Sequence, residues 1–288
     1  MLLSSRPRIN GRGCMNGGIS ARLGRRANVC VRASAEYEAL RGKVAYKASS
    51  GDPVELLSLW EPYPSSKVVI PCLTHFADLT SWEFAQKLIK VIPTLESSGV
   101  RVITVGLGSV SNAQEFARTL GFPMDRLYAL PEASLYRSVG FSAGFAPELD
   151  VNPYLKLLPM LAGIGSPGTV QEVLRGYVGD QAAKAVFDSP TPFDILGAGY
   201  QRPFELATLR LFNMMGILPK WNELCPPDTQ LLTQQGGCLV FSGSQVVFKH
   251  VDSGILRYSD VDTLMQAALQ ADYTPITSVA VAAEVLEE

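Results

Sequence analysis

The stretch KVVIPCLTHFADLTSWE, residues 67–83, joins a short apolar run directly to a helix-start pattern. The run over 67–74 is rich in β-branched residues, which favours a buried strand. Thr80 and Glu83 then match the Ser/Thr-x-x-Glu capping box. Apolar residues follow at helical spacing: Phe84, Leu88, Ile89, Ile92 and Leu95. We therefore predict a buried strand that leads through a short turn into an amphipathic helix.

The same alternation of strand and helix continues along the chain. The further predicted elements are a strand at 100–105, a helix at 111–120, a strand at 127–130, a helix at 132–139, a hairpin at 238–250 and a helix at 260–269. Alternating strands and helices imply parallel strands, and the hairpin adds antiparallel ones. The predicted fold class is α/β, with a thioredoxin-like mixed sheet flanked by helices.

A long block rich in Gly and Pro, residues 142–231, interrupts this pattern and exceeds an ordinary connection. We interpret it as a largely helical insertion, with helices at 155–161, 170–178 and 204–215. The last helix has a broad apolar face with Arg210 opposite it, and we expect that face to pack in the core rather than to bind a membrane. A surface for an unknown protein partner is the alternative if the insertion protrudes.

The resulting organisation has six parts. They are a transit peptide (1–33), a linker with an entry strand (34–50), the first part of the thioredoxin-like domain (51–141), the insertion (142–231), the C-terminal hairpin and helix (232–271) and a tail (272–288). We place no transmembrane segment in the chain, because no window of about 18 apolar residues occurs without charges.

The first 33 residues hold seven Arg, no Lys and no acidic residue. Arg-rich, acid-poor composition is typical of an organellar transit peptide, and cleavage near Ala33 is expected. A disordered basic tail and a mitochondrial presequence are the alternatives. No second apolar signal follows, so we expect the chloroplast stroma. Taking those seven from the 25 basic residues leaves 18 against 27 acids, a net charge of −9 that disfavours nucleic acid and anionic membranes as partners.

Residues 71–83 resemble the AhpC/TSA-type, peroxiredoxin-like family, in particular its plant and algal chloroplast members. The supporting stretches are 99–108, 122–128, 134–141 and 232–241. The resemblance implies a thioredoxin fold. The insertion is similar to that of a plastid subgroup and departs from the minimal family pattern.

Family peroxidases carry Pro-x-x-x-Thr-x-x-Cys between a strand and a helix, where helix amides lower the pKa of the thiol. Here Pro71 matches the Pro, His75 falls on the Thr position and Asp78 falls on the Cys position. Some relatives have further Cys at the positions of Thr80 and Ser81. Because a carboxylate cannot cycle through sulfenic acid, the resemblance implies a missing peroxidatic sulfur.

The candidate site therefore lies at the N-terminus of this helix. Its residues are Thr74, His75, Asp78, Thr80 and Ser81, faced by the loop of Gln235, Gly236 and Gly237. His75 and Asp78 would make an acid–base pair; alternatively, Asp78 merely caps helix amides. The loop is otherwise a tight turn into the hairpin. We take the cleft between this loop and residues 75–82 as the place for any ligand.

The remaining candidates are thiols and one glycine motif. Cys72 and Cys238 lie on strands that would be neighbours, so they form either a redox pair or buried structural residues. Cys225 precedes two prolines and is expected in a loop. Residues 163–168 match G-x-G-x-x-G, but Pro167 fits better as a helix start capped by Ser166. We predict no metal site and no cofactor, since only two His and no CxxC occur.

Two functions follow from these observations. The first is a non-peroxidatic, thioredoxin-fold binding or regulatory module. The second is a divergent antioxidant or thiol oxidoreductase that uses Cys72, together with Cys238.

Overall fold

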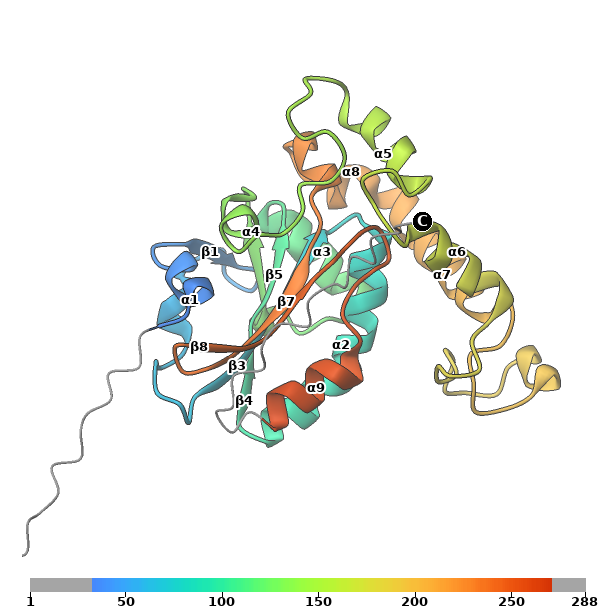
Figure 1. Cartoon of the computed structure of the whole chain (residues 1–288), viewed down its shortest axis with the longest axis horizontal. Helices are drawn as coiled ribbons and strands as arrows, with labels where there is room; N and C mark the ends of the chain where they lie inside the picture. The colour runs from blue at the N-terminus through green and yellow to red at the C-terminus, as the bar shows by residue number, and fades with distance from the viewer. Residues whose placement is uncertain (1–32, 271–288) are drawn as a thin grey trace, which may run out of the picture. The chain divides into compact units, whose positions relative to one another are not determined.

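The computed structural model describes residues 33–270, in which eight strands form one mixed sheet (Figure 1). The strands are β1 (Val44–Lys47), β2 (Pro53–Glu55), β3 (Lys67–His75), β4 (Val100–Val102), β5 (Thr104–Leu107), β6 (Leu127–Leu130), β7 (Gly237–Ser242) and β8 (Gln245–Val251). The helices are α1 (Ala35–Ala39), α2 (Leu79–Ser97), α3 (Val110–Leu120), α4 (Ser134–Ser138), α5 (Pro153–Leu161), α6 (Thr169–Val178), α7 (Glu205–Ile217), α8 (Trp221–Leu224) and α9 (Val261–Leu269). The predicted fold class is confirmed.

The strand order is β2-β1-β6-β5-β3-β7-β8, and β4 also pairs with β3. The central strand β3 runs parallel to β5 and antiparallel to β7. Beyond them, β6 is parallel to β5, while β1 and β8 are antiparallel to their neighbours. Because helices cover both faces of the sheet, β3 is buried along nearly its whole length, which explains its continuous apolar sequence.

Two hydrophobic clusters fill the two faces of the sheet. One face packs against α2, α3 and α9, for example through Leu88, Phe116 and Leu264. The other face packs against α1, α4 and a 3₁₀ helix at Leu56–Leu59. Alternate residues of β3 serve the two clusters, since side chains along a strand point to opposite faces.

Some predicted elements differ from the observed ones. The run over 100–105 forms two strands, because β4 pairs with the first half of β3 and β5 with the second half. The segment 34–50 contains the expected entry strand, β1, and also the helix α1, which was not predicted. The predicted capping box is wrong: α2 begins at Leu79, and Thr80 and Glu83 are buried within its first turns. Their side chains bond to distant segments, described below.

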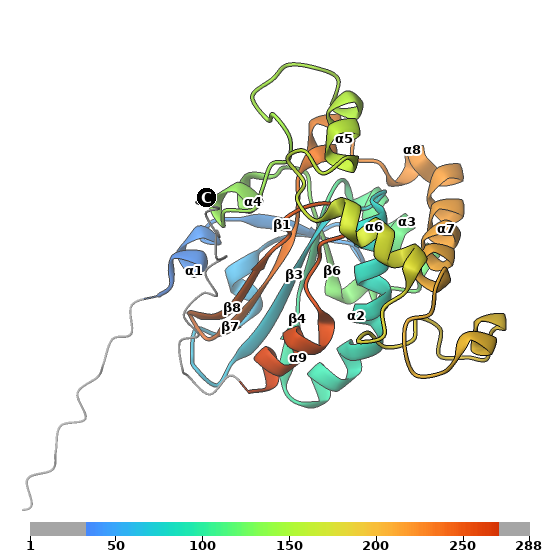
Figure 2. The same cartoon turned by 45° about the vertical axis from the view of Figure 1, so that its right-hand side comes forward.

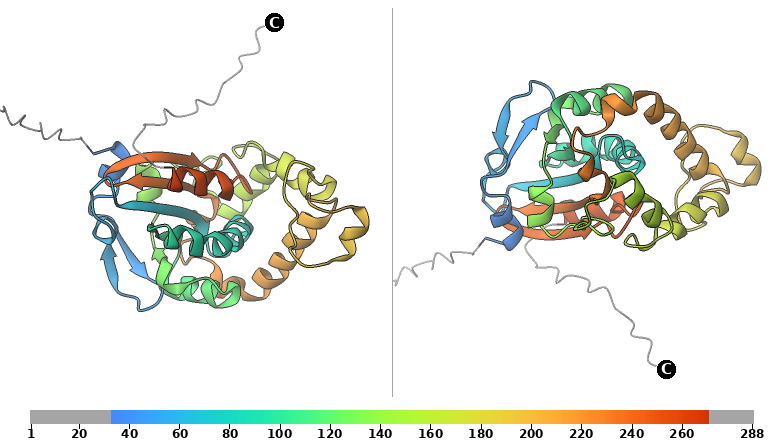
Figure 3. Two further views of the ribbon diagram at one scale, coloured as in Figure 1. Left: turned by 90° about the horizontal axis from the view of Figure 1, so that it is seen from below. Right: turned by 90° about the horizontal axis from the view of Figure 1, so that it is seen from above.

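The insertion contains α5 to α8, near the predicted helix positions. It lies on the side of the sheet away from α1 and β1 (Figures 1 and 2). The segment between α6 and α7 extends furthest from the sheet in the views from below and above (Figure 3). The helix start predicted at Pro167 is wrong, since Gly168 occupies the N-cap position of α6 with φ of 86°. The hydroxyl oxygen of Ser166 instead accepts a hydrogen bond from the backbone N–H of Ile255.

The expectation that the apolar face of α7 packs in the core is right only for Leu206, which is buried. Leu211, Phe212 and Met215 are exposed, whereas Arg210 and Asn213 are buried. The polar face is buried because it finds polar partners on α2. The predictions for 1–33 and 272–288 fall outside the described residues, apart from Ala33. Among residues 33–270, no helix has the length and apolar character needed to cross a membrane.

Candidate functional site

The junction between β3 and α2 is built around Asp78. This residue holds the N-cap position of α2, but its side chain bonds to none of the helix amides. Its Oδ2 instead accepts a hydrogen bond from Thr74 Oγ1 at 2.5 Å. Ser81 Oγ lies 2.7 Å from Thr74 Oγ1. Because Thr74 has one hydroxyl proton and donates it to Asp78, Ser81 is the donor to Thr74. The capping role proposed for the Asp78 side chain is therefore wrong.

Thr80 lies on the same first turn of α2 but faces another segment. Its hydroxyl oxygen accepts a hydrogen bond from the backbone N–H of Leu256 at 3.1 Å. Thr80 thereby anchors the segment between β8 and α9 to α2, and it does not join the side chains around Asp78.

His75, the last residue of β3, is buried beneath the insertion. Its ring packs edge-on against Trp221, with 6.4 Å between ring centroids. Burial lowers the pKa of His75, and the nearby Asp78 charge opposes that effect. Its Nδ1 finds no hydrogen-bond partner among the described residues. The backbone amide of Asp78 donates to the His75 carbonyl at 3.0 Å. The Asp78 side chain, however, bonds to Thr74 and not to the His75 ring, so the predicted acid–base pair is not hydrogen-bonded.

The loop of Gln235, Gly236 and Gly237 lies against β3 at Cys72 and Leu73. A Cβ atom on Gly236 would stand 2.2 Å from the carbonyl oxygen of Cys72, so the close approach requires glycine. Both Gln234 and Gln235 are buried, and the backbone N–H of Gln235 donates to the carbonyl of Ser142 at 2.8 Å. The insertion thus begins by covering this loop.

Asp252, which the sequence reasoning missed, is a buried carboxylate beside the loop. Its amide donates to the carbonyl of Gly236 at 3.2 Å, and its Oδ1 lies 3.4 Å from His250 Nε2. Burial raises the pKa of Asp252 to about 6, the charge of Asp78 adds to the rise, and His250 opposes it. The nearest sequence signal was His250, one of the two histidines, at the end of the predicted hairpin.

The two candidate redox thiols lie on opposite faces of the sheet. In the antiparallel ladder, Pro71 pairs with Cys238 and Cys72 pairs with Gly237. Paired residues share a face and successive residues alternate, so the two sulfur atoms point away from each other. Cys238 packs in one hydrophobic cluster and Cys72 in the other. Burial raises the pKa of both thiols far above the ordinary value.

The third described thiol, Cys225, follows α8 within the insertion. It is partly buried, and burial raises the pKa of its thiol. Its sulfur lies 3.7 Å from the carbonyl oxygen of Pro226. Among residues 33–270, therefore, Asp78 and no sulfur occupies the N-cap of α2.

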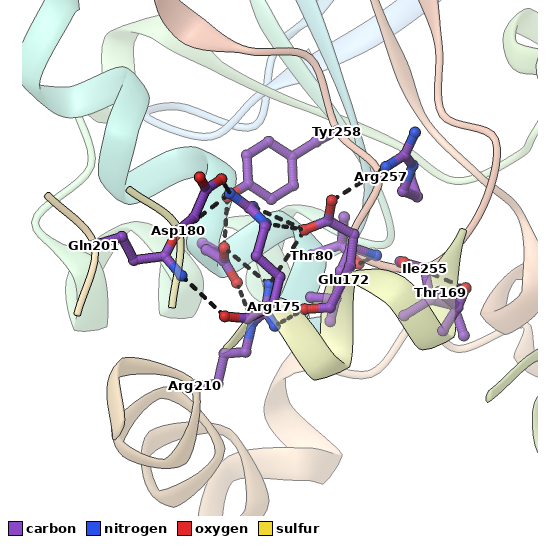
Figure 4. A network of polar contacts seen from close by, with 12 residues as sticks. Thr80, Thr169, Glu172, Arg175, Asp180, Gln201, Arg210, Ile255, Arg257 and Tyr258 are labelled. Carbon is purple, nitrogen blue, oxygen red and sulfur yellow. Dashed lines mark hydrogen bonds and ion pairs between the residues drawn. The ribbon is translucent and has the colours of Figure 1, made fainter. Parts of the chain in front are cut away.

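A second polar site that sequence reasoning missed links α2 to the insertion (Figure 4). The buried Glu83 accepts a bond from Arg210 Nε at 2.8 Å and one from the Tyr258 hydroxyl at 2.5 Å. Arg210 also donates to the carbonyl of Glu172 at 2.7 Å. Arg175 and Arg257 both pair with the Glu172 carboxylate, at 2.8 and 3.1 Å. This network holds α6 and α7 against α2 and the segment before α9.

The expected cleft between the loop and residues 75–82 is filled. Thr74, His75 and Gln235 are each at most 4% exposed, and Asp78 is partly exposed. A surface depression of about 410 Å³, lined by Arg101, Arg126 and neighbours, lies at the start of β4 and β5 instead. In the part of the chain that the structure describes, no three His, Cys, Asp or Glu residues gather as a metal site.

Comparison with known proteins adds the family. The sequence model described as AhpC/TSA antioxidant enzyme matches residues 87–254, more than half of the 288-residue chain. No curated protein and no solved structure gives a significant match. The matched range begins after the junction at Asp78 and contains the facing loop and the hairpin. With a mixed sheet of the expected topology, the chain belongs to the AhpC/TSA antioxidant enzyme family.

Proposed function

We propose that this chain is a non-peroxidatic member of its family, which acts as a binding or regulatory module. The observation that carries the proposal is the carboxylate of Asp78 at the N-cap of α2, held by Thr74. Helix amides at that position would stabilise a thiolate, whereas a carboxylate there has no redox cycle.

The state of the thiols supports the same proposal. The thiolate is the nucleophile, and a raised pKa leaves almost none of it at neutral pH. Burial raises the pKa of Cys72, Cys225 and Cys238 alike. The alternative of a Cys72–Cys238 redox centre has no support in the geometry, because the sulfur atoms are separated by the sheet.

A peroxidase assay tests this proposal. The full-length protein is mixed with hydrogen peroxide and a dithiol reductant, and peroxide consumption is followed. We expect consumption equal to that of the protein-free control. Consumption that scales with protein concentration, and that Cys72→Ser or Cys225→Ser abolishes, would refute the proposal.

We further propose that the protein works in the chloroplast stroma. The support is the composition of residues 1–33, which contain seven Arg and no acidic residue. The test is to fuse this segment to a fluorescent protein in a green cell. Stromal fluorescence is expected, and mitochondrial or cytosolic fluorescence contradicts the proposal.

A further inference from the structure

Lys87 lies on α2, one turn after Glu83, beside the polar network that joins α2 to the insertion (Figure 4). Its Nζ stands 4.8 Å from the centre of the Tyr258 ring. Phe84 stacks on the same ring, with 5.3 Å between the two ring centroids. These contacts hold the amine of Lys87 over an aromatic ring, while the residue as a whole is exposed to solvent.

The charge of Lys87 has no bonded anionic partner. Among residues 33–270, no hydrogen bond or ion pair joins its Nζ to another group. The carboxylate of Glu83 is already bonded to Arg210 and to the Tyr258 hydroxyl. The carboxylate of Asp260 is bonded within the first turn of α9. The ring face of Tyr258 attracts an ammonium group but offers its N–H donors no oxygen.

Positive charges of the insertion act on Lys87 as well. Glu83 and Lys87 are four residues apart on one face of α2, so Arg210, bonded to Glu83 at 2.8 Å, lies on the same side of the helix. Partial desolvation of the amine by the surrounding protein lowers the pKa of Lys87. The carboxylates of Glu83 and Asp260 oppose this effect, and the guanidinium groups of Arg175 and Arg210 add to it. More of the amine is therefore neutral near pH 7.5 than in an ordinary lysine.

We propose that Lys87 is a site of covalent acylation by acyl groups that are carried as thioesters. The lone pair of the neutral amine attacks the carbonyl carbon of the thioester, a C–N bond forms and the C–S bond breaks. The thiolate leaves and takes up the proton that the amine releases, so the products are an amide and a free thiol. The reaction needs a lysine that is both accessible and partly neutral, and Lys87 meets both conditions.

Lys90 provides a matched comparison on the same helix. It lies three residues after Lys87 and is also exposed, but its amine pairs with the carboxylate of Asp188. An ammonium group in such a pair has no lone pair for attack. A preference for Lys87 over Lys90 therefore separates the effect of the surroundings from that of exposure. The inference goes beyond the proposed function and does not depend on residue 78.

The test treats the full-length protein with acetyl-CoA and follows the acetylation of each lysine by quantitative mass spectrometry. At about pH 7.5 we expect Lys87 to react at least about 3-fold faster than Lys90, and the excess should shrink toward about pH 10 as other amines lose their protons. In a second measurement, the ¹³C shift of the Lys87 ε-carbon should titrate with a midpoint below 10.5. The variant Lys87→Arg identifies that signal and should leave the acetylation of Lys90 unchanged.

Three results would overturn the proposal. One is acetylation of Lys87 no faster than that of Lys90 at about pH 7.5. Another is an excess that stays constant up to about pH 10, because exposure alone would then explain it. The third is a midpoint for Lys87 at or above 10.5, which would leave its amine no more neutral than that of an ordinary lysine. The rate comparison uses the wild-type chain, so it does not depend on the folding of a variant.

Discussion

Cys72 and Cys238 lie on paired strands of one sheet, with their side chains on opposite faces. A disulfide between them would need one strand to slip by a residue, which would turn its buried side chains to the wrong face. We expect the folded, full-length protein to form no Cys72–Cys238 disulfide when treated with diamide. Peptide mapping by mass spectrometry measures this, and alkylation of both thiols in denaturant is the control. A disulfide formed under native conditions would show that our register is wrong.

The ion pair of Glu83 and Arg210 should dominate the attachment of the insertion. Replacing Arg210 by Met leaves the Glu83 carboxylate buried without its counter-charge, and such losses cost about 3–5 kcal/mol. Urea unfolding measures the change. The double variant Glu83→Gln/Arg210→Met should recover part of the loss, because the uncompensated charge is gone. The exposed variant Arg41→Met, which removes a surface pair with Glu38, should show no measurable change. Equal stability for Arg210→Met and the wild type would contradict the network.

Asp252 should make stability depend on pH. Its pKa rises on folding from 3.8 to about 6, so the folded state holds the proton more tightly than the unfolded state does. The contribution of Asp252 to the stability of the folded protein is therefore largest below pH 4 and is lost as the pH rises through about 6. The shift corresponds to about 3 kcal/mol. Relative to the wild type, Asp252→Asn should gain up to that amount between pH 4 and pH 7.5. Urea unfolding at both pH values measures the gain, and a constant difference would contradict it.

His75 should act in the opposite direction. Its pKa is lowered by burial, so protonation of the unfolded state below about pH 6.5 pulls the wild type toward unfolding. The variant His75→Phe keeps a ring against Trp221 but cannot take up a proton. Its stability relative to the wild type should rise as pH falls from 7.5 to 5. A relative stability that falls over this range would mean that His75 is protonated in the folded protein.

Local patterns in the sequence predicted the central sheet well. The run at Lys67–His75 and the two runs of the hairpin are apolar and bounded by turn residues, so each element could be recognised alone. The break between β4 and β5 was not predicted, because no Gly or Pro marks Ile103. That break arises from pairing with both halves of β3, which is a tertiary effect.

The site was harder to predict because its contacts connect distant residues. Glu83 matched a local capping pattern, but its partner Arg210 lies 127 residues away and captures its side chain. The face that Cys238 occupies depends on a register that the sequence does not encode locally. Asp252 gave no signal, because its burial comes from the Gly236 loop folding against β3. Asp78 was placed correctly at the start of α2, since a strand-to-helix junction is a local feature.

The proposal that thiol chemistry is missing at the junction is tested most directly by trapping sulfenic acid. The full-length protein and the variant Asp78→Cys are treated with hydrogen peroxide and dimedone, and each cysteine is quantified by mass spectrometry. We predict no rapid labelling of Cys72, Cys225 or Cys238 in the wild type, and selective labelling at position 78 in the variant, where helix amides lower the thiol pKa. Rapid labelling of any of these three wild-type thiols would contradict the account.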